Sequence, residues 1–376
     1  MKALFVGGTG TISAAVSRKA LEAGWELWLL NRGRRNAELP RGFSEIVCDI
    51  DAAGAEAEVA SKIRGALEPG EKFDCVADFI VFSRAQAERD WRLFRDLTRQ
   101  YFFISTASAY QKPPANHLVT EETPLGNPFW AYSRAKIACE EFFMAKRREE
   151  GFPITIVRPS HTYGERSVPL GVHGANGSWQ VLKRMLDGKP VIVHGDGTSL
   201  WTMTSSRDFA KGFVGLMGNV HALGEAVQIT SDETVSWNQV YEAVARALGV
   251  ELRAVHVSSE FLHLCAPAGK GYDFLGSLIG DKANSAVFDN SKLKRLVPGF
   301  CATVRFDEGV RETVAHVLGH EECQRGDPEF DAWCDRVIAA LDAARERVRD
   351  EPGCGGGHGC GDGGPDASAP TSSLMM

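Results

Sequence analysis

The start of the chain alternates short apolar runs with an amphipathic pattern. Residues 2–6 form an apolar run, a Gly-rich turn follows, and apolar positions within 12–23 recur at helical spacing until Gly24. A second apolar run covers 26–30. This order predicts a strand, a helix and a second strand, which together make a βαβ unit.

The same alternation continues to about residue 160. Helical patterns occur, for example, at 84–100 and 132–149. They separate further short apolar runs typical of buried strands, at 45–48, 73–77, 101–105 and 154–158. Strands that alternate with helices in this way predict an α/β fold of Rossmann type, with a doubly wound parallel sheet.

Beyond this point the pattern loosens, which predicts a smaller second lobe. We expect a helix near 179–187, a short strand at 190–194, and a strand and helix pair at 225–230 and 236–248 that can rejoin the sheet. The lobe is then partly discontinuous in sequence. The expected domains are a Rossmann domain of 1–163 plus about 224–250, and a lobe of 164–223 plus about 251–327.

The end of the chain changes character twice. Residues 328–350 have the pattern of an amphipathic helix, whereas 351–376 are rich in Gly, Ser, Pro, Asp and Ala and have little to bury. We therefore expect a C-terminal helix followed by a disordered tail. The tail holds Cys354, His358 and Cys360, but a structural zinc site takes four ligands, so no metal is expected.

Composition and charge narrow the class of protein. The 376 residues are about two and a half times a typical domain of ~150, and 44% of them are hydrophobic, enough for a sizeable core. The 42 basic and 49 acidic residues give a net charge of −7, which argues against a nucleic-acid partner. No apolar run approaches ~20 residues, so no membrane span is expected. Nine scattered cysteines and the lack of an export signal favour a cytoplasmic protein.

A glycine-rich loop, Gly7-Gly8-Thr9-Gly10-Thr11-Ile12-Ser13, lies between the first predicted strand and helix, the context of a dinucleotide fingerprint. Gly7 permits a tight turn, Gly10 lets a pyrophosphate approach the backbone, and small Ser13 replaces the glycine that packs the helix. The helix N-terminus attracts the phosphates. The candidate cofactor-binding residues here are Gly7, Gly10, Thr11 and Ile12.

The residues after the next two strands bear on the choice of dinucleotide. An acidic residue after the second strand favours NAD, because its carboxylate accepts hydrogen bonds from both ribose hydroxyls and repels a 2′-phosphate. Here Asn31 can bond the ribose, and Arg32 or Arg35 can pair with a 2′-phosphate. NADP is therefore slightly favoured, and NAD is also compatible. After the third strand, Asp49-Ile50 is a candidate adenine contact.

The helix predicted at 132–149 places a phenol and an ammonium on one face. Tyr132 and Lys136 are four residues apart, hence one turn from each other. A cation beside a tyrosine lowers its pKa from ~10 towards working pH, as general acid–base chemistry needs. The preceding strand ends in hydroxyl residues, Ser105-Thr106-Ala107-Ser108.

Taken together, these motifs resemble the extended short-chain dehydrogenase/reductase superfamily, NAD-dependent epimerase/dehydratase branch, over roughly residues 1–320. The segments beginning Arg158-Pro159, Val193-His194-Gly195 and Arg207-Asp208 are similar to later landmarks of the family. The resemblance implies that Thr106 polarises a substrate oxygen, Tyr132 transfers the proton, and Lys136 holds the nicotinamide ribose. It also implies that Pro159 contacts the nicotinamide end.

Two segments depart from the family pattern. The segment before the active-site loop, usually rich in His and Ala, reads Ala77-Asp78-Phe79-Ile80-Val81, with Phe79 as the candidate nicotinamide contact. Many nucleotide-sugar enzymes of the family have an Arg-Asp pair where this chain has Trp201, which offers a stacking face or core packing but no charge. The substrate therefore either differs from the usual nucleotide sugar or has its phosphate bound elsewhere, for instance by Lys183 or Arg184.

Four residues are candidate substrate contacts: Ser108, His161, Asn176 and Trp201. His161 adjoins the expected cleft, although a local turn role is also open. Asn176 lies at the start of the predicted lobe helix, so an N-cap role is an alternative.

The resemblance implies an epimerase with tightly bound NAD(P) that transiently oxidises a secondary alcohol of a sugar, nucleotide sugar or related polyol. A net-redox NADP-dependent reductase or dehydrogenase would use the same residues. A cofactor sensor is disfavoured by Tyr132 and Lys136, and an RNA-binding relative by the net charge. Relatives commonly pair two such helices, so a homodimer is expected, with Ile137, Phe142 and Phe143 as core or dimer residues.

Overall fold

The computed structural model describes residues 1–34, 39 and 41–350. They belong to two compact units, Met1–Cys334 and a second that begins at Asp335. The predicted tail at 351–376, with Cys354, His358 and Cys360, lies outside the described residues, as does Arg35.

A seven-stranded sheet, with every strand pair parallel, forms the centre of the first unit. Its strands, in spatial order, are β12 (Ala226–Ile229), β7 (Ile154–Pro159), β5 (Tyr101–Ile104), β4 (Cys75–Asp78), β1 (Lys2–Val6), β2 (Glu26–Asn31) and β3 (Phe43–Val47). The predicted doubly wound sheet is confirmed. The strand order reverses between β1 and β4, and ligands of such sheets bind at the carboxyl ends of the strands near this point.

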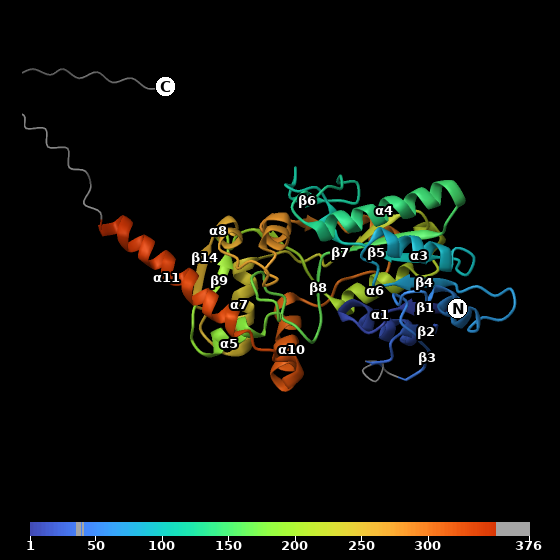
Figure 1. Cartoon of the computed structure of the whole chain (residues 1–376), viewed down its shortest axis with the longest axis horizontal. Coiled ribbons are helices and arrows are strands. Elements are labelled where there is room, and N and C mark those ends of the chain that lie inside the picture. Colours follow the sequence, from blue (N-terminus) through green and yellow to red (C-terminus); the bar gives the residue numbers. More distant parts are fainter. Residues whose placement is uncertain (35–38, 40, 351–376) are drawn as a thin grey trace, which may run out of the picture. The chain divides into compact units, whose positions relative to one another are not determined.

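Helices cover both faces of this sheet (Figure 1). On one face, α1 (Thr11–Glu22) and α6 (Ser206–Leu216) pack against side chains such as Phe5 and Leu29. On the other, α2 (Glu56–Arg64), α3 (Arg84–Phe94) and α4 (Ala131–Glu150) pack against side chains such as Leu4 and Val76. Because both faces are covered, the strands carry continuous apolar runs, the pattern that identified them in the sequence.

The helix predicted at 84–100 ends at Phe94, earlier than the pattern indicated. The residues after it pair with the chain just before β4 instead. The Phe73 N–H donates to the Leu97 carbonyl at 2.9 Å, and the Arg99 N–H donates to the Phe73 carbonyl at 2.9 Å. These two bonds replace the helical ones that residues 97–99 would otherwise make.

The remaining elements of the first unit gather beyond the carboxyl ends of the strands (Figure 1). The larger ones are α5 (Trp179–Leu186), β9 (Val191–His194), α7 (Trp237–Leu248), β14 (Ala254–Val257), α8 (Ser259–Leu264), the π-helix η4 (Leu275–Lys282) and α10 (Phe306–Gly319). By contrast, α9 (Ser291–Leu296) packs against α6 and β12. The predicted pair at 225–230 and 236–248 divides: β12 joins the main sheet, whereas α7 packs against α10, α5 and β9. The division into two domains is otherwise still a prediction.

Short strand pairs connect these elements. They are β6 (Leu118–Val119) with β15 (Val287–Phe288), β8 (His161–Tyr163) with β11 (Met203–Ser205), and β10 (Leu200–Trp201) with β13 (Val235–Ser236). Single turns of 3₁₀ helix are η2 (Ala107–Ala109), η3 (Val220–Ala222) and η5 (Glu321–Cys323).

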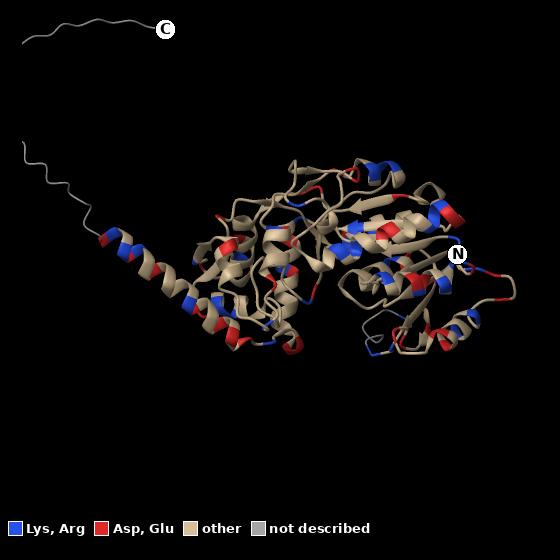
Figure 2. Cartoon of the chain, turned by 45° about the horizontal axis from the view of Figure 1, so that its top comes forward, with Lys and Arg blue, Asp and Glu red and all other residues tan. Residues whose placement is uncertain are grey.

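The predicted C-terminal helix is α11 (Pro328–Asp350), along which acidic and basic side chains alternate (Figure 2). In the described part of the chain, no helix is both long and apolar enough to cross a membrane.

Candidate active site

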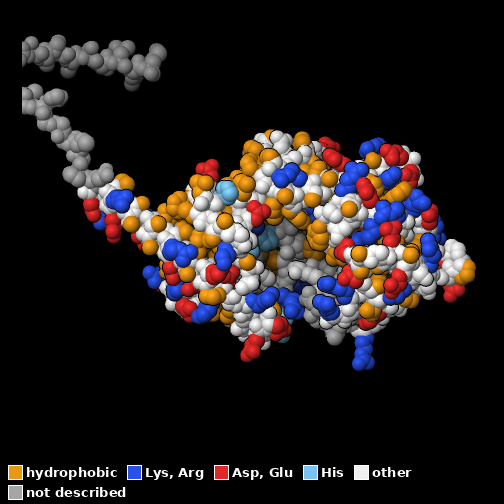
Figure 3. Space-filling view, viewed as in Figure 1, with side chains coloured by type: hydrophobic (Ala, Val, Ile, Leu, Met, Phe, Trp, Pro, Cys, Tyr) orange, Lys and Arg blue, Asp and Glu red, His pale blue; other side chains and the backbone are white. Residues whose placement is uncertain are grey.

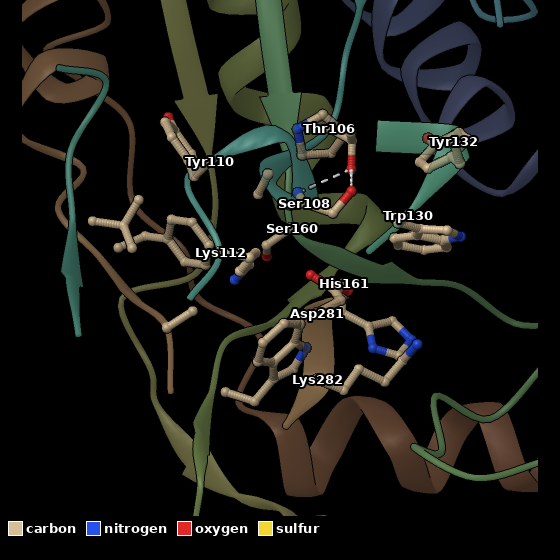
Figure 4. Close-up of a pocket in the computed structure, with 16 residues that line it drawn as sticks. Thr106, Ser108, Tyr110, Lys112, Trp130, Tyr132, Ser160, His161, Asp281 and Lys282 are labelled. Carbon is tan, nitrogen blue, oxygen red and sulfur yellow. Dashed lines mark hydrogen bonds between the residues drawn. The ribbon is translucent and has the colours of Figure 1, made fainter. Parts of the chain in front are cut away.

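A cavity of 310 Å³ lies beyond the carboxyl ends of β5 and β7 (Figure 4). It brings together six of the residues predicted from the sequence: Thr106, Ser108, Tyr132, Pro159, His161 and Trp201. Its volume is at the lower end of the range of about 300–1,000 Å³ typical of small-molecule sites. A pocket that gathers hydroxyls, a phenol and an imidazole is suited to proton transfer with a small polar substrate.

Three hydroxyls form a hydrogen-bonded chain, and two of them, those of Thr106 and Ser108, line the cavity. Thr106 caps η2, where its Oγ1 accepts the Ser108 N–H at 3.2 Å and lies 3.0 Å from Ser108 Oγ. Ser108 Oγ in turn lies 2.7 Å from Ser133 Oγ, on the first turn of α4. This chain fixes the rotamers of the hydroxyls that face the cavity.

The buried side chain of Asn127 is hydrogen-bonded to this chain of hydroxyl residues. Its Nδ2 donates to the Ser108 carbonyl at 2.9 Å, to Ser133 Oγ at 3.3 Å and to the Gly280 carbonyl at 2.7 Å. One carboxamide therefore ties the hydroxyl chain to η4, which is far away in the sequence. The sequence offered no local signal for this role.

Tyr132 lies on the first turn of α4 and is half-buried. Its ring centroid is 5.1 Å from that of Trp130, which also lines the cavity. Burial raises the pKa of Tyr132 above its ordinary value, while its contact with the Thr106 side chain lowers it and the charge of Asp281 raises it further. In this structure the phenol is therefore held in its protonated form.

Lys136 is buried one turn further along α4. Its Nζ donates to the carbonyls of Val81 at 2.6 Å and Ile104 at 2.7 Å, and lies 5.8 Å from the ring centroid of Tyr132. Burial lowers the pKa of Lys136 to about 8. The expected depression of the Tyr132 pKa is not seen, because burial of the phenol prevails and the ammonium is bonded to two carbonyls.

A buried ion pair supports the strand ends beneath the cavity. Arg158, on β7, donates to Glu140 on α4 with Nη2–Oε2 2.6 Å and Nε–Oε1 3.0 Å, and both side chains are buried. The Glu140 carboxylate also accepts the Ser105 hydroxyl, and the Arg158 guanidinium lies 4.9 Å from the Tyr110 ring centroid. Because planar Arg–carboxylate forks are rigid, this pair holds β5, β7 and α4 in register.

The glycine-rich loop forms a tight cradle where β1 meets α1. Gly7 has a φ of +97°, and a Cβ added there would lie 3.1 Å from Ile80 Cγ2 and 3.6 Å from Phe79 Cβ. Only glycine adopts this conformation without strain. Phe79 thus lies beside Gly7, with its ring centroid 5.6 Å from that of Phe5 in the core. The Gly10 N–H donates to Ser13 Oγ at 2.7 Å, so Ser13 caps the start of α1.

The loop also borders a larger cavity of 620 Å³ between α1, α6 and α10. Gly10 and Thr11 line it, together with basic side chains that include Arg18, Arg207 and Lys211. Figure 3 shows the surface hollowed between these elements, with Lys and Arg side chains on its rims. A helix N-terminus and cations that face one cavity fit a phosphate-bearing group.

The other predicted cofactor residues lie along the same edge of the sheet. Asn31 ends β2, and its Oδ1 accepts the Gly33 N–H at 2.7 Å, which shapes the turn that carries exposed Arg32. Asp49 follows β3 and is exposed, while neighbouring Ile50 is buried. The β2–β3 register pairs Asn31 with Val47, two residues before Asp49.

One predicted substrate contact lies away from the cavity around Tyr132. Asn176 is exposed, and its Nδ2 donates to the Gly326 carbonyl at 2.9 Å. The reason is local: the Gly174–Gly177 turn precedes α5 and directs this side chain towards the segment before α11. Asn176 does not line the cavity around Tyr132, and its role as a substrate contact stays a prediction. Phe142 and Phe143, left open as core or dimer residues, are both buried in the core, where the Phe143 ring contacts Tyr101 and Phe152.

Several residues that line the cavity were not predicted. Among them are Lys112, Trp130, Asp281, Lys282 and Phe288. All except Trp130 come from segments without a motif, and η4 reaches the cavity only through tertiary packing. The single signal in the sequence was the position of Trp130, two residues before Tyr132.

Comparison with known proteins identifies a family. The model of the NAD dependent epimerase/dehydratase family matches residues 3–230. A curated relative from Streptomyces kanamyceticus, 2′-dehydrokanamycin reductase, is 25% identical over 300 residues, which is 80% of each chain. An uncharacterized UDP-glucose epimerase from Bacillus subtilis is 31% identical over 137 residues, 36% of this chain and 40% of that protein.

A solved structure shares the fold. The UDP-glucuronic acid 4-epimerase of Bacillus cereus, in complex with NAD, superposes with a TM-score of 0.62 at 18% identity, over 84% of this chain and 96% of that one.

Proposed function

The chain belongs to the NAD-dependent epimerase/dehydratase family, and we propose that it exchanges a hydride between a nicotinamide cofactor and a carbinol carbon of a sugar or related polyol. One observation carries this proposal: the hydroxyls of Thr106 and Ser108, which lie 3.0 Å apart, border one cavity together with the Tyr132 phenol. Acid–base groups that converge on a small pocket are the arrangement that carbonyl and alcohol chemistry requires.

The hydroxyl residues and Tyr132 have different roles towards the substrate oxygen. Thr106 or Ser108 donates a hydrogen bond to that oxygen, and Tyr132 gives or removes its proton. The pKa of Tyr132 is raised by burial, so removal of a proton needs a nearby positive charge. Lys136 lies on the next turn of the same helix, and its pKa of about 8 leaves it largely charged at neutral pH.

The chain's own residues also fit a dinucleotide. The Gly7 cradle, which a Cβ would crowd, and the α1 N-terminus at Gly10, Thr11 and Ile12 suit the pyrophosphate. We assign Asn31 and Arg32 to the adenine ribose, and Asp49 and Ile50 to the adenine. We assign Phe79 and Pro159 to the nicotinamide wall and Lys136 to the nicotinamide ribose. When bound, the nicotinamide accepts or returns the hydride.

The first candidate reaction is epimerisation through a transient ketone with retained cofactor. It is supported by relatives named as UDP-glucose epimerases. Net reduction of a ketone is the second candidate, because the relative that matches over 80% of both chains is named as a reductase. We propose NADP as the slightly preferred cofactor, on the strength of Arg32.

The nicotinamide released from the denatured, purified protein tests this proposal. For an epimerase we expect about one nicotinamide per chain, and inversion of a sugar carbon without a lasting change in cofactor absorbance. For a reductase we expect free exchange and stoichiometric oxidation of NADPH. For a reductase, NADPH deuterated at C4 should pass its label to the product. For an epimerase the hydride returns to the carbon that it left, so a substrate deuterated at the inverted carbon should keep its label in the product. A protein that neither retains nor binds a nicotinamide, or that neither passes the cofactor label to a product nor keeps the substrate label through inversion, would refute the proposal.

A further inference from the structure

Lys112 is a buried lysine in the wall of the candidate active site. Only 6% of its surface is exposed, and burial lowers its pKa. Its ammonium makes no hydrogen bond or ion pair with any residue that the structure describes, and Figure 4 shows it pointing into the cavity. A desolvated ammonium without a partner is costly, so such a group is expected to meet its partner in a ligand.

Asp281 faces the same cavity from η4. Its carboxylate, too, has no hydrogen-bond partner within the described part of the chain. The charge of Lys112 lowers the pKa of Asp281, but burial, the larger effect, raises it. The two side chains sense each other's charge without forming an ion pair. A ligand in the space between them could therefore accept a hydrogen bond from Lys112 and donate one to Asp281.

Close packing of η4 places Asp281 there. A Cβ on Gly276 would lie 2.1 Å from Trp130 Cδ1, and one on Gly280 would lie 3.0 Å from Phe129 Cβ. The Asn127–Gly280 hydrogen bond of 2.7 Å then fixes η4 against the hydroxyl chain. π-Helical turns are rare in proteins, and those that do occur are often found at functional sites.

The charges around the cavity favour an anionic ligand. Lys112 and Lys282 are basic, whereas Asp281 is the one acidic side chain in the lining. Lys282 Nζ already donates to the Ser277 carbonyl at 3.3 Å. Burial lowers the pKa of His161 to about 3, so this imidazole is neutral at physiological pH. Among the described residues of the lining, Lys112 is thus the cation whose ammonium has no hydrogen-bond acceptor, and the aromatic faces of Trp130 and Trp201 remain for a sugar ring.

We propose that this pocket selects a sugar or polyol with an acid group: Lys112 binds the carboxylate or phosphate, and Asp281 accepts a hydroxyl of the same molecule. The inference rests on the proposed function, since it names the class of substrate for that site. A cavity of 310 Å³ suits one substituted ring. The ring would lie between this charged pair and Tyr132.

Titration calorimetry on the full chain saturated with NADP⁺ tests the proposal without turnover. The probes are glucose, glucuronate and glucose 6-phosphate, which share a ring and differ in the acid group. We expect the better acid probe to bind at least about tenfold more tightly than glucose. The two acid probes also distinguish a carboxylate from a phosphate.

Three variants sharpen the test. Lys112→Met should weaken binding of the preferred acid probe by about tenfold to a hundredfold, and more than it weakens glucose. Lys112→Arg keeps the charge and should retain most of the preference, even if Lys112→Met folds poorly. Lys72→Met, at an exposed lysine away from the cavity, is the matched control and should change nothing.

The proposal is overturned if glucose binds as tightly as both acid probes, if no probe binds, or if Lys112→Met keeps the preference with an unchanged melting temperature. Hydride transfer is scored separately, with labelled cofactor for reduction and labelled substrate for epimerisation. Acid binding that depends on Lys112 without hydride transfer would refute the proposed function and leave an anion site. Hydride transfer that is indifferent to the acid group and to Lys112 would refute only the present inference.

Discussion

The two walls of the candidate active site are built in opposite ways. On the sheet side, Thr106, Ser108 and Ser133 satisfy one another's hydrogen bonds and rest on the Asn127 carboxamide. On the lobe side, Asp281 lacks a hydrogen-bond partner among the described residues. The contrast suggests a division of labour: the sheet side is preorganised for chemistry, and the lobe side has bonding capacity that a substrate would satisfy.

The largest expected effect comes from removing the proton carrier of the sheet-side wall. Tyr132→Phe should lower turnover by about 10²–10⁴, because only the transferable proton is lost, while cofactor affinity stays unchanged. Asp281→Asn, on the opposite wall, should act mainly on KM. Steady-state kinetics and cofactor titration measure both variants. A Tyr132→Phe protein that keeps more than about a tenth of the wild-type rate would contradict this role.

The stability of the protein should depend on the buried charge of Arg158, which lies beneath the sheet-side wall. Arg158→Met should lower the free energy of unfolding by about 3–5 kcal/mol, because Glu140 then stays buried without its partner. The matched control is Arg207→Met, which breaks the exposed 2.6 Å pair with Glu312 and should cost at most about 1 kcal/mol. Urea denaturation compares them, and equal losses would show that the buried pair has no special role.

The stability of the protein should fall in acid because His194, in the lobe, has a buried imidazole. Burial lowers the pKa of His194 to about 4 in the folded protein, against an ordinary value of 6.5 when unfolded. Between these values the unfolded chain binds a proton that the folded chain does not, so stability falls as pH drops from 6.5 towards 4, by up to about 3 kcal/mol. His194→Gln should flatten this slope in urea titrations at several pH values. An unchanged slope would assign the acid sensitivity to other groups.

The smallest expected effect concerns cofactor choice at the sheet edge. Arg32→Ala should weaken the binding of NADP by about tenfold and that of NAD much less, because only NADP carries the 2′-phosphate that a guanidinium can bind. Arg34→Ala, two residues further on, is the control. Calorimetric titration of both cofactors decides the matter. Equal losses for the two cofactors would remove Arg32 from the 2′-phosphate site.

Much of the sheet side was predictable because its signals are local. The buried strands carry apolar runs, Gly7 marks a turn that needs a positive φ, and Tyr132 and Lys136 share a helix face through their spacing alone. The helix predicted to run past Phe94 was wrong for a nonlocal reason. Residues 97–99 pair with Phe73, and a competing partner outside the helix leaves no trace in helical periodicity.

The sequence by itself thus determined the βαβ order, the glycine cradle and the proton-transfer wall, since each depends on residues within a few turns of one another. Only the tertiary structure decided which charges face that wall. Lys112 and Asp281 come from distant segments, and their approach depends on how Gly276 and Gly280 let η4 pack against Trp130 and Phe129. Periodicity reports which face of an element is buried, but it carries no information about which distant element packs against that face.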